Sequence, residues 1–157
     1  MIEIFCKNQR ATENVAETLA ERANGGDLFA LTGDLGAGKS TFARAFIRAA
    51  LEDPDADVPS PTFTLVQSYA ATPEIHHTDL YRLKDPDEVY ELGLDEERDT
   101  SVLLVEWPDR MPGDWWQGAL EITLKREGKA TEAGDEARRL TFKGDQGRWQ
   151  DLLAGLL

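Results

Sequence analysis

The chain is short of cysteine, of long apolar runs and of basic residues. Among its 157 residues there is one cysteine, Cys6, which excludes an internal disulfide framework and favours a reducing compartment. No apolar run is long enough to span a bilayer, and residues 1–15 do not have the pattern of a signal peptide. We therefore expect a cytoplasmic protein that makes no membrane contact.

Acidic residues dominate, with 30 aspartates and glutamates against 17 lysines and arginines and a net charge of -13. Affinity for nucleic acid comes largely from basic side chains that meet phosphates, so this balance disfavours direct binding of DNA or RNA. If tRNA is involved, we expect a partner protein to hold it. The basic side chains near the C-terminus are interpreted as solvated charge on a hairpin, with a local RNA or partner contact as the alternative: Lys125, Arg126, Arg138 and Arg139.

Residues 31–41 read LTGDLGAGKST and fit the pattern G-x-x-x-x-G-K-[ST] at Gly33, Gly38, Lys39 and Ser40. In such a loop, backbone N–H groups hold phosphates, the lysine reaches the outer phosphates and the hydroxyl holds magnesium. Glycine lets the backbone approach the anion without a Cβ in the way. The preceding apolar run and the following helical spacing supply the strand and the helix that the motif requires. A phosphate-binding P-loop is predicted, and a glycine-rich turn that caps a helix is the alternative.

Helical and strand-like patterns alternate along the chain. Strands are expected at residues 2–5, 28–31, 62–70, 75–83, 101–107, 119–127 and 137–144. Helices are expected at residues 11–24, 40–51, 85–94 and 147–157. The length favours one P-loop domain over residues 1–157. The alternation predicts an α/β fold, a P-loop NTPase-like three-layer sandwich with a mixed, mainly parallel central sheet and a late antiparallel hairpin.

Hydrolysis of a nucleotide needs acidic groups beside the loop. Glu106 ends the apolar run VLLVE, so it is predicted to stand beside magnesium, with a solvated strand end as the alternative. Asp79 also ends a strand-like run, and its position alone fits a second acid of the site or a structural role, as an N-cap or in a salt bridge, equally well. Ser60 and Thr62 place two hydroxyls in a Pro-rich loop, which fits either a sensor of the terminal phosphate or an ordinary strand entry.

Five segments occur in the order and spacing of one bacterial family: GDLGAGKST, SPTFTLV, HTDLYRL, ELGLDE and LVEWPDR. From about residue 12 to residue 110 the chain resembles the TsaE (YjeE) family, and the C-terminal third matches only in general pattern. The resemblance implies a P-loop ATPase that uses ATP and Mg²⁺ in threonylcarbamoyladenosine modification of tRNAs reading codons that begin with A. It also implies that the TsaB and TsaD proteins are partners, and that ATP turnover resets their complex between transfers.

The same resemblance implies roles residue by residue. Lys39, Asp79 and Glu106 would be catalytic, and Ser40 and Glu106 would hold the metal ion. The chain departs from the family pattern at Thr78 and at residues 97–99, where local packing rather than chemistry is expected to differ. Nucleotide contacts would come from Leu35, Gly36, Ala37, Gly38, Lys39, Ser40, Thr41, Thr62 and Trp107.

Three other functions share a P-loop. A small-molecule kinase needs an arginine-bearing lid, and no arginine cluster follows the expected P-loop helix. A GTPase needs an N-K-x-D segment, which the sequence does not contain, so ATP is favoured. A nucleotide-gated binding module without hydrolysis would leave Asp79 and Glu106 with structural roles only.

Three conspicuous features are interpreted as structural. Cys6 lies in a strand-like run and is expected to be a packed core thiol. His76 and His77 would point to opposite faces of a strand, so this pair is not expected to form a metal site. Trp115 and Trp116 are expected to be one core ring and one half-buried ring, with a base-stacking or partner-contact surface as the alternative.

Overall fold

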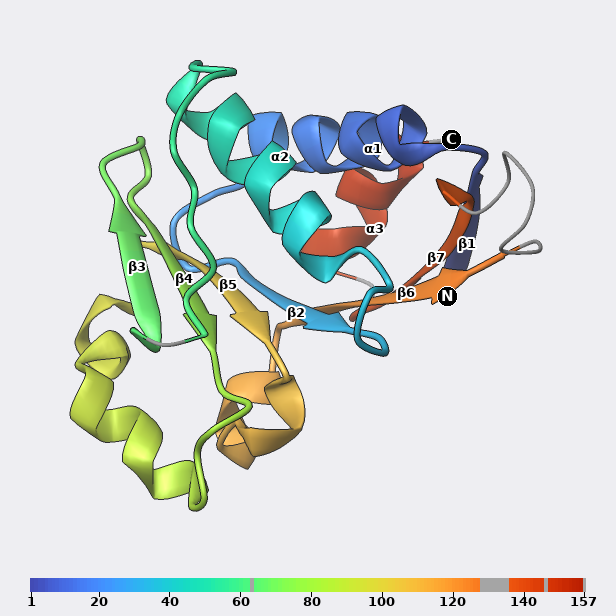
Figure 1. The fold of residues 1–157 in the computed structure, drawn as a ribbon. Helices are drawn as coiled ribbons and strands as arrows, with labels where there is room; N and C mark the ends of the chain where they lie inside the picture. The colour runs from blue at the N-terminus through green and yellow to red at the C-terminus, as the bar shows by residue number, and fades with distance from the viewer. Residues whose placement is uncertain (63, 128–135, 146, 157) are drawn as a thin grey trace.

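The structure is a computed structural model that describes residues 1–62, 64–127, 136–145 and 147–156. Within these residues, seven strands form one sheet in the order β1-β7-β6-β2-β5-β4-β3 (Figure 1). The strands are β1 (Ile2–Cys6), β2 (Leu28–Thr32), β3 (Val66–Tyr69), β4 (Ile75–Asp79), β5 (Val102–Glu106), β6 (Leu120–Arg126) and β7 (Arg138–Lys143). The α-helices are α1 (Gln9–Arg22), α2 (Lys39–Leu51) and α3 (Arg148–Ala154). The 3-10 helices are η1 (Pro86–Leu92), η2 (Leu94–Glu97), η3 (Pro108–Arg110) and η4 (Gly113–Trp116).

The middle of the sheet is parallel and its margins are antiparallel. Strands β6, β2, β5 and β4 run in the same direction. Strand β7 lies antiparallel between β6 and β1, and β3 is antiparallel to β4. Both β4 and β5 are buried along their whole length, as expected for strands covered on both faces. The mixed sheet and the late hairpin formed by β6 and β7 confirm the fold predicted from the sequence.

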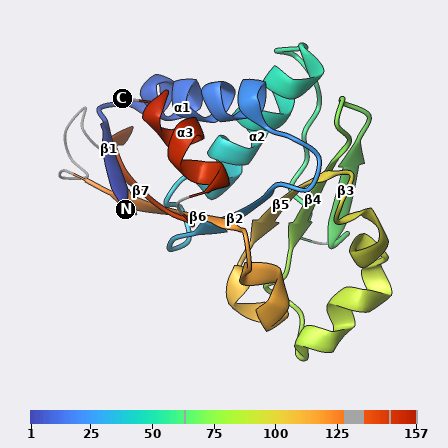
Figure 2. The ribbon, with the colours of Figure 1, turned by 180° about the vertical axis from the view of Figure 1, so that it is seen from behind.

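A layer of helices covers each face of the sheet. Helices α1, α2 and α3 lie together over one face, and the 3-10 helices lie on the other (Figures 1 and 2). The helix expected at residues 85–94 is therefore present as two 3-10 helices. Asp85 caps the start of η1 through Asp87 N, and Gly93, with φ +74°, ends it after seven residues. The backbone here forms the tighter turns of a 3-10 helix in place of the α-helix that the sequence pattern predicts.

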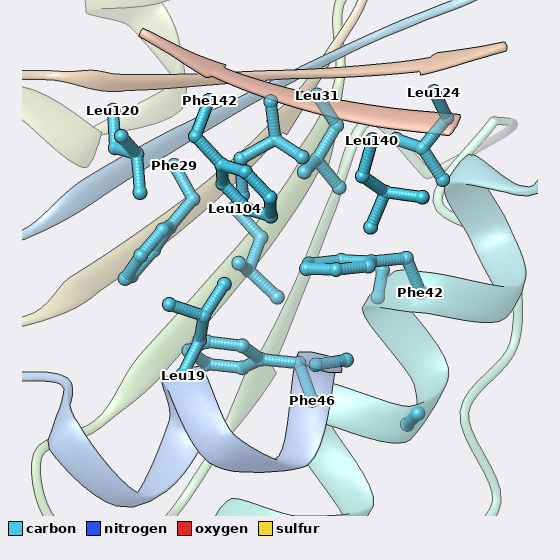
Figure 3. Close-up of a cluster of buried hydrophobic side chains, with 14 of the residues drawn as sticks. Leu19, Phe29, Leu31, Phe42, Phe46, Leu104, Leu120, Leu124, Leu140 and Phe142 are labelled. Carbon is cyan, nitrogen blue, oxygen red and sulfur yellow. The ribbon is translucent and has the colours of Figure 1, made fainter. Parts of the chain in front are cut away.

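The larger core lies between the sheet and the helices α1 and α2. Figure 3 shows Leu104 of β5 and Phe29 of β2 extending from the sheet toward Phe42 and Phe46 of α2 and Leu19 of α1. The ring centroids of Phe29 and Phe46 are 5.2 Å apart, in a tilted arrangement that aromatic pairs prefer. This packing anchors α2, and with it the loop that precedes α2, to the centre of the sheet.

The residues interpreted as structural occupy the expected environments. Cys6 is 1% exposed, and burial raises the pKa of its thiol, so it is a core residue. Trp115 is buried and Trp116 is half-buried, as predicted. None of the described helices has the length and apolar character needed to cross a membrane.

Two strands are shorter than their patterns suggested. The strand expected at residues 62–70 begins only at Val66, because Leu65 N donates to Pro61 O (2.7 Å) in a turn and Leu65 has φ +67°. The strand expected at residues 75–83 ends at Asp79, whose Oδ1 accepts a hydrogen bond from Tyr81 N (2.9 Å). Residue 63 of the first segment and residue 157 of the closing helical segment lie outside the described residues.

Candidate functional site

The candidate site lies at one edge of the sheet, where the carboxyl ends of the parallel strands meet. Strand β2 ends there in the loop of residues 33–38, and β4 and β5 end there with Asp79 and Glu106. The Cα atoms of these two acids are paired in the sheet register. Open α/β sheets bind ligands at this edge. The topology thus brings the predicted loop and both predicted acids together.

Glycines at three positions of the loop of residues 33–38 have a positive φ: Gly33, Gly36 and Gly38. Gly33 has φ +147°, and a Cβ there would lie 2.6 Å from the carbonyl oxygen of Leu124 in β6. Gly36 has φ +79°, and a Cβ there would meet the Arg126 guanidinium at 2.5 Å. The loop enters α2 at Gly38, and no side chain caps the start of this helix. The first amides of α2 and the positive end of its dipole therefore form a site for an anion.

Lys39 begins α2, and its ammonium is buried beside the loop. The residue is 6% exposed, and Nζ donates to the carbonyl oxygen of Gly33. Burial lowers the pKa of Lys39, and the carboxylates of Glu106 and Asp79 oppose that shift. Lys39 forms no ion pair with the residues that the structure describes. A buried positive charge without a bonded carboxylate favours an anionic ligand at this position.

Asp79 and Glu106 are both buried, at 5% and 3% exposure. In addition to its bond from Tyr81 N, Asp79 accepts a hydrogen bond at Oδ2 from Thr62 Oγ1 (3.1 Å). Ser60 Oγ lies 2.7 Å from Thr62 Oγ1. Asp79 thus joins the end of β4 to the Pro-rich loop that carries both predicted hydroxyls.

His77 also belongs to the site, although no motif pointed to it. Its Nε2 lies 2.6 Å from Glu106 Oε2, and both side chains are buried. Its Nδ1 is buried and has no hydrogen-bond partner among the described residues. A neutral ring with its proton on Nε2 would donate a hydrogen bond to the Glu106 carboxylate. The signal available in the sequence was spacing: His77 and Asp79 are two residues apart on a strand and share a face.

An aromatic pair closes one side of the site. Trp107 directly follows β5 in a left-handed conformation, with φ +57°. Lys39 Nζ lies 3.7 Å from the centroid of the Trp107 ring, which is the range of a cation–π contact. The Tyr81 ring lies 4.9 Å from the Trp107 ring, and Tyr81 is 54% exposed. The Trp107 ring is therefore within reach of whatever the loop binds.

A hollow of about 250 Å³ connects these groups. Of the nine residues predicted to contact a nucleotide, eight line the hollow, and all three predicted catalytic residues do. Ala37 is the exception, because its side chain is 3% exposed and packs in the core. The lining consists of Leu35, Gly36, Gly38, Lys39, Ser40, Thr41, Thr62, Asp79, Glu106, Trp107 and Arg138. Hydroxyl and carboxylate oxygens suit a hard divalent cation, and the anion site beside them suits a phosphate chain.

Two arginines of the hairpin contact the loop. Arg138 is half-buried, which corrects its interpretation as solvated charge, whereas Arg126 stays exposed. Arg138 Nε donates to Ala37 O (2.7 Å), and Arg138 Nη2 lies 3.4 Å from Gly36 O. Arg126 Nε donates to Gly36 O (3.2 Å). The two arginines are paired in the register of β6 and β7, and β6 lies beside β2. The hairpin therefore brings both guanidinium groups to the loop, although they lie about 100 residues later in the sequence than the loop does.

The sheet order and the loop between β2 and α2 define a protein of the P-loop NTPase-like fold class. The family model named Threonylcarbamoyl adenosine biosynthesis protein TsaE matches residues 6–137. The chain therefore belongs to the TsaE family.

Individual relatives agree with this assignment. The tRNA threonylcarbamoyladenosine biosynthesis protein TsaE of Rickettsia felis is 39% identical over 138 residues, which cover 87% of this chain and 76% of the relative. The protein of the same description from Bacillus subtilis is 37% identical over 147 residues, which cover 92% and 87%. The crystal structure of Bacillus subtilis YdiB matches with a TM-score of 0.75 at 30% identity, covering 99% of this chain and 93% of that chain. This structural likeness confirms the fold class.

Proposed function

We propose that the chain is a Mg²⁺-dependent ATP hydrolase that acts with TsaB and TsaD in threonylcarbamoyladenosine modification of tRNA. Membership of the TsaE family supports the pathway. The observation that carries the activity is the meeting of Lys39, Asp79 and Glu106 in one hollow at the open start of α2. Binding alone needs the loop and the lysine, whereas two buried carboxylates beside them fit hydrolysis.

The loop and Lys39 would bind the phosphates. Amides at the start of α2 would hold the inner phosphate oxygens, and the glycines leave room for this close approach. Lys39 Nζ would leave Gly33 O and turn to the outer phosphates, where the anion compensates the free energy lost by burying its charge. Trp107 would pack beside the nucleotide.

Ser40 and Glu106 are the residues that would hold Mg²⁺. Both line the hollow, and a hydroxyl and a carboxylate are the oxygen ligands that Mg²⁺ takes in P-loop proteins. The ion would neutralise charge on the outer phosphates during transfer. His77 would keep Glu106 in one orientation through the 2.6 Å contact.

Asp79 would position the attacking water. Its carboxylate is held at Oδ1 by Tyr81 N and at Oδ2 by Thr62 Oγ1, so it has a fixed direction before any substrate binds. Thr62 can exchange this bond for one to the terminal phosphate or its metal ion, which would couple the Pro-rich loop to the state of the nucleotide. Such a loop suits a protein whose ATP turnover resets a partner complex.

The test is phosphate release from ATP in the presence of Mg²⁺, measured with the chain alone and with TsaB and TsaD. A tRNA modification assay is run alongside it. We expect slow release by the chain alone, faster release with the partners, and repeated modification only when ATP is hydrolysed. Modification that continues without phosphate release would reject hydrolysis and leave a nucleotide-gated binding module. Transfer of the phosphate to a small molecule would instead indicate a kinase.

A further inference from the structure

A second cluster of metal-ligating side chains lies at the other end of β4, away from the P-loop. Its centre is His76, which is 6% exposed and points to the opposite face of the strand from His77. His76 Nδ1 forms a hydrogen bond with Ser68 Oγ at 2.7 Å. His76 Nε2 is buried and has no hydrogen-bond partner among the described residues. A buried ring nitrogen without a partner is costly unless a ligand satisfies it.

Two carboxylates face this nitrogen. Glu74 Oε1 lies 3.3 Å from His76 Nε2, and Glu97 Oε2 lies 4.0 Å from it. All three ligand atoms lie within 4.8 Å of one another. Glu74 immediately precedes β4 and is two residues from His76, whereas Glu97 ends η2. Because the two glutamate side chains are about half exposed, they can adjust around an ion while the histidine stays fixed.

We propose that Glu74, His76 and Glu97 form a binding site for a divalent transition-metal ion of the zinc type. Zn²⁺ takes nitrogen and oxygen ligands at about 2.0–2.2 Å in a tetrahedron, which separates two ligand atoms by about 3.3–3.6 Å. The Glu74–His76 separation already falls in this range, and the Glu97 separation reaches it after a small side-chain shift. The set supplies three protein ligands and leaves a fourth position for water.

The chemistry of the set favours zinc over magnesium or calcium. An imidazole ligand suits Zn²⁺, whereas Mg²⁺ and Ca²⁺ prefer oxygen ligands alone. The Ser68 hydroxyl on Nδ1 fixes the ring and directs Nε2 at the carboxylates, as outer partners of metal-bound histidines do. A protonated His76 that forms ion pairs with the two glutamates is the rival interpretation, since both separations lie within ion-pair distance, and the Zn²⁺ titration below distinguishes the two. An ion at the centre of the cluster would satisfy all three groups.

The bound ion would join the start of β4 to η2. His77, the neighbour of His76, points to the other face and contacts Glu106 in the nucleotide site. The His76–His77 pair was not expected to form a metal site. In the structure the two rings face different carboxylates, with Glu74 and Glu97 near His76 and Glu106 near His77. The proposal is independent of ATP chemistry, so it can fail while the proposed function stands.

The test is a Zn²⁺ titration of the chelator-treated protein by competition with a chromophoric chelator, with Mg²⁺ in excess and no nucleotide. We expect one Zn²⁺ per chain. His76→Gln and Glu97→Gln should each weaken binding by about tenfold or more, since even outer partners of metal ligands contribute about 10- to 100-fold. Glu96→Gln, an exposed neighbour on η2, is the matched control that should bind as tightly as the original chain.

Thermal unfolding gives a second measurement. Zn²⁺ should raise the melting temperature of the original chain and of Glu96→Gln, but not of Glu97→Gln, because a ligand stabilises only the state that binds it. If His76→Gln fails to fold, Glu74→Gln and Glu97→Gln, which change exposed side chains, carry the test. Absence of Zn²⁺ binding, or binding that these substitutions leave unchanged, overturns the proposal. Binding that survives His76→Gln in a folded chain shows surface carboxylates only and also overturns it.

Discussion

His77 and Glu106 form a buried contact across two neighbouring parallel strands. His77 Nε2 lies 2.6 Å from Glu106 Oε2, with side-chain exposures of 2% and 4%. The contact takes up one oxygen of the carboxylate, and Glu106 also lines the hollow. In metal sites, an outer partner of this kind fixes the direction of the ligand and tunes its affinity. We therefore propose that His77 positions Glu106, the proposed Mg²⁺ ligand.

Replacing His77 should change the dependence of activity on Mg²⁺. We expect His77→Leu to raise the half-saturating Mg²⁺ concentration for ATP hydrolysis by about 10- to 100-fold, because Glu106 loses its fixed orientation. His77→Gln, whose amide can still donate to Glu106, should retain more of the affinity. The measurement is phosphate release against Mg²⁺ concentration, with circular dichroism to verify folding. An unchanged Mg²⁺ dependence in both variants would mean that the contact is only structural.

Lys39→Ala should abolish ATP hydrolysis. The ammonium is the buried cation beside the loop, and donors aimed at developing charge contribute about 100- to 1000-fold to turnover. Removing it also removes a charge whose burial costs free energy, so the variant should fold at least as stably as the original chain. Lys84→Ala, which changes an exposed lysine, is the control. Near-normal turnover in folded Lys39→Ala would reject the P-loop assignment.

Substitutions of the two acids should have different effects on nucleotide binding and on turnover. Glu106→Gln should weaken Mg²⁺-dependent nucleotide binding, because Glu106 is the proposed metal ligand at the end of β5. Asp79→Asn should leave ATP bound and lower turnover by about 100-fold or more, the usual contribution of a group that activates the attacking water. Calorimetry for affinity and phosphate release for turnover distinguish the two. The reverse pattern would exchange the two roles.

The loop could be predicted from the sequence because its chemistry is local. Gly33, Gly38 and Lys39 stand at fixed spacing between one strand and one helix, so the motif specified both the backbone and the charge. Asp79 and Glu106 could also be predicted from the sequence, because both end buried strands, and parallel strands end at the same edge of a sheet. Their juxtaposition follows from topology rather than from any local pattern.

The remaining site residues depend on long-range pairing. Arg138 reaches the loop only because β7 pairs with β6 and β6 pairs with β2, an order of strands that no local pattern encodes. The partner of His77 lies 29 residues away on another strand. The boundary of β3 was missed for a different reason: β-branched and aromatic residues continue through a turn that Leu65 forms with a positive φ. Side-chain composition indicates a strand there, and backbone hydrogen bonding ends it.

Arg138 should act on nucleotide affinity. Its guanidinium holds the carbonyl groups of Ala37 and Gly36, and hydrogen bonds to charged groups contribute about 1.5–3 kcal/mol. We expect Arg138→Ala to raise the KM for ATP by about 10- to 100-fold through a loosened loop, with a smaller change in kcat. Arg139→Ala is the matched control, since Arg139 pairs with Glu127 rather than with the loop. A fall in kcat at constant KM would instead indicate that Arg138 contacts the transferred phosphate.

The chain alone should bind tRNA weakly, near the non-specific range of about 10⁻⁴ to 10⁻⁶ M or weaker. Its net charge is -13, and several of its arginines already have partners within the chain. Arg148 pairs with Asp27 at 2.7 Å, and Arg139 pairs with Glu127 at 2.7 Å, so these groups would have to give up protein contacts to meet phosphates. Filter binding at two salt concentrations measures the affinity and its electrostatic share, first for the chain alone and then with TsaB and TsaD. Tight binding should require the partners, and ATP should change the affinity of the chain for them. Nanomolar, salt-sensitive binding by the chain alone would contradict this view and assign the protein to the RNA-binding class.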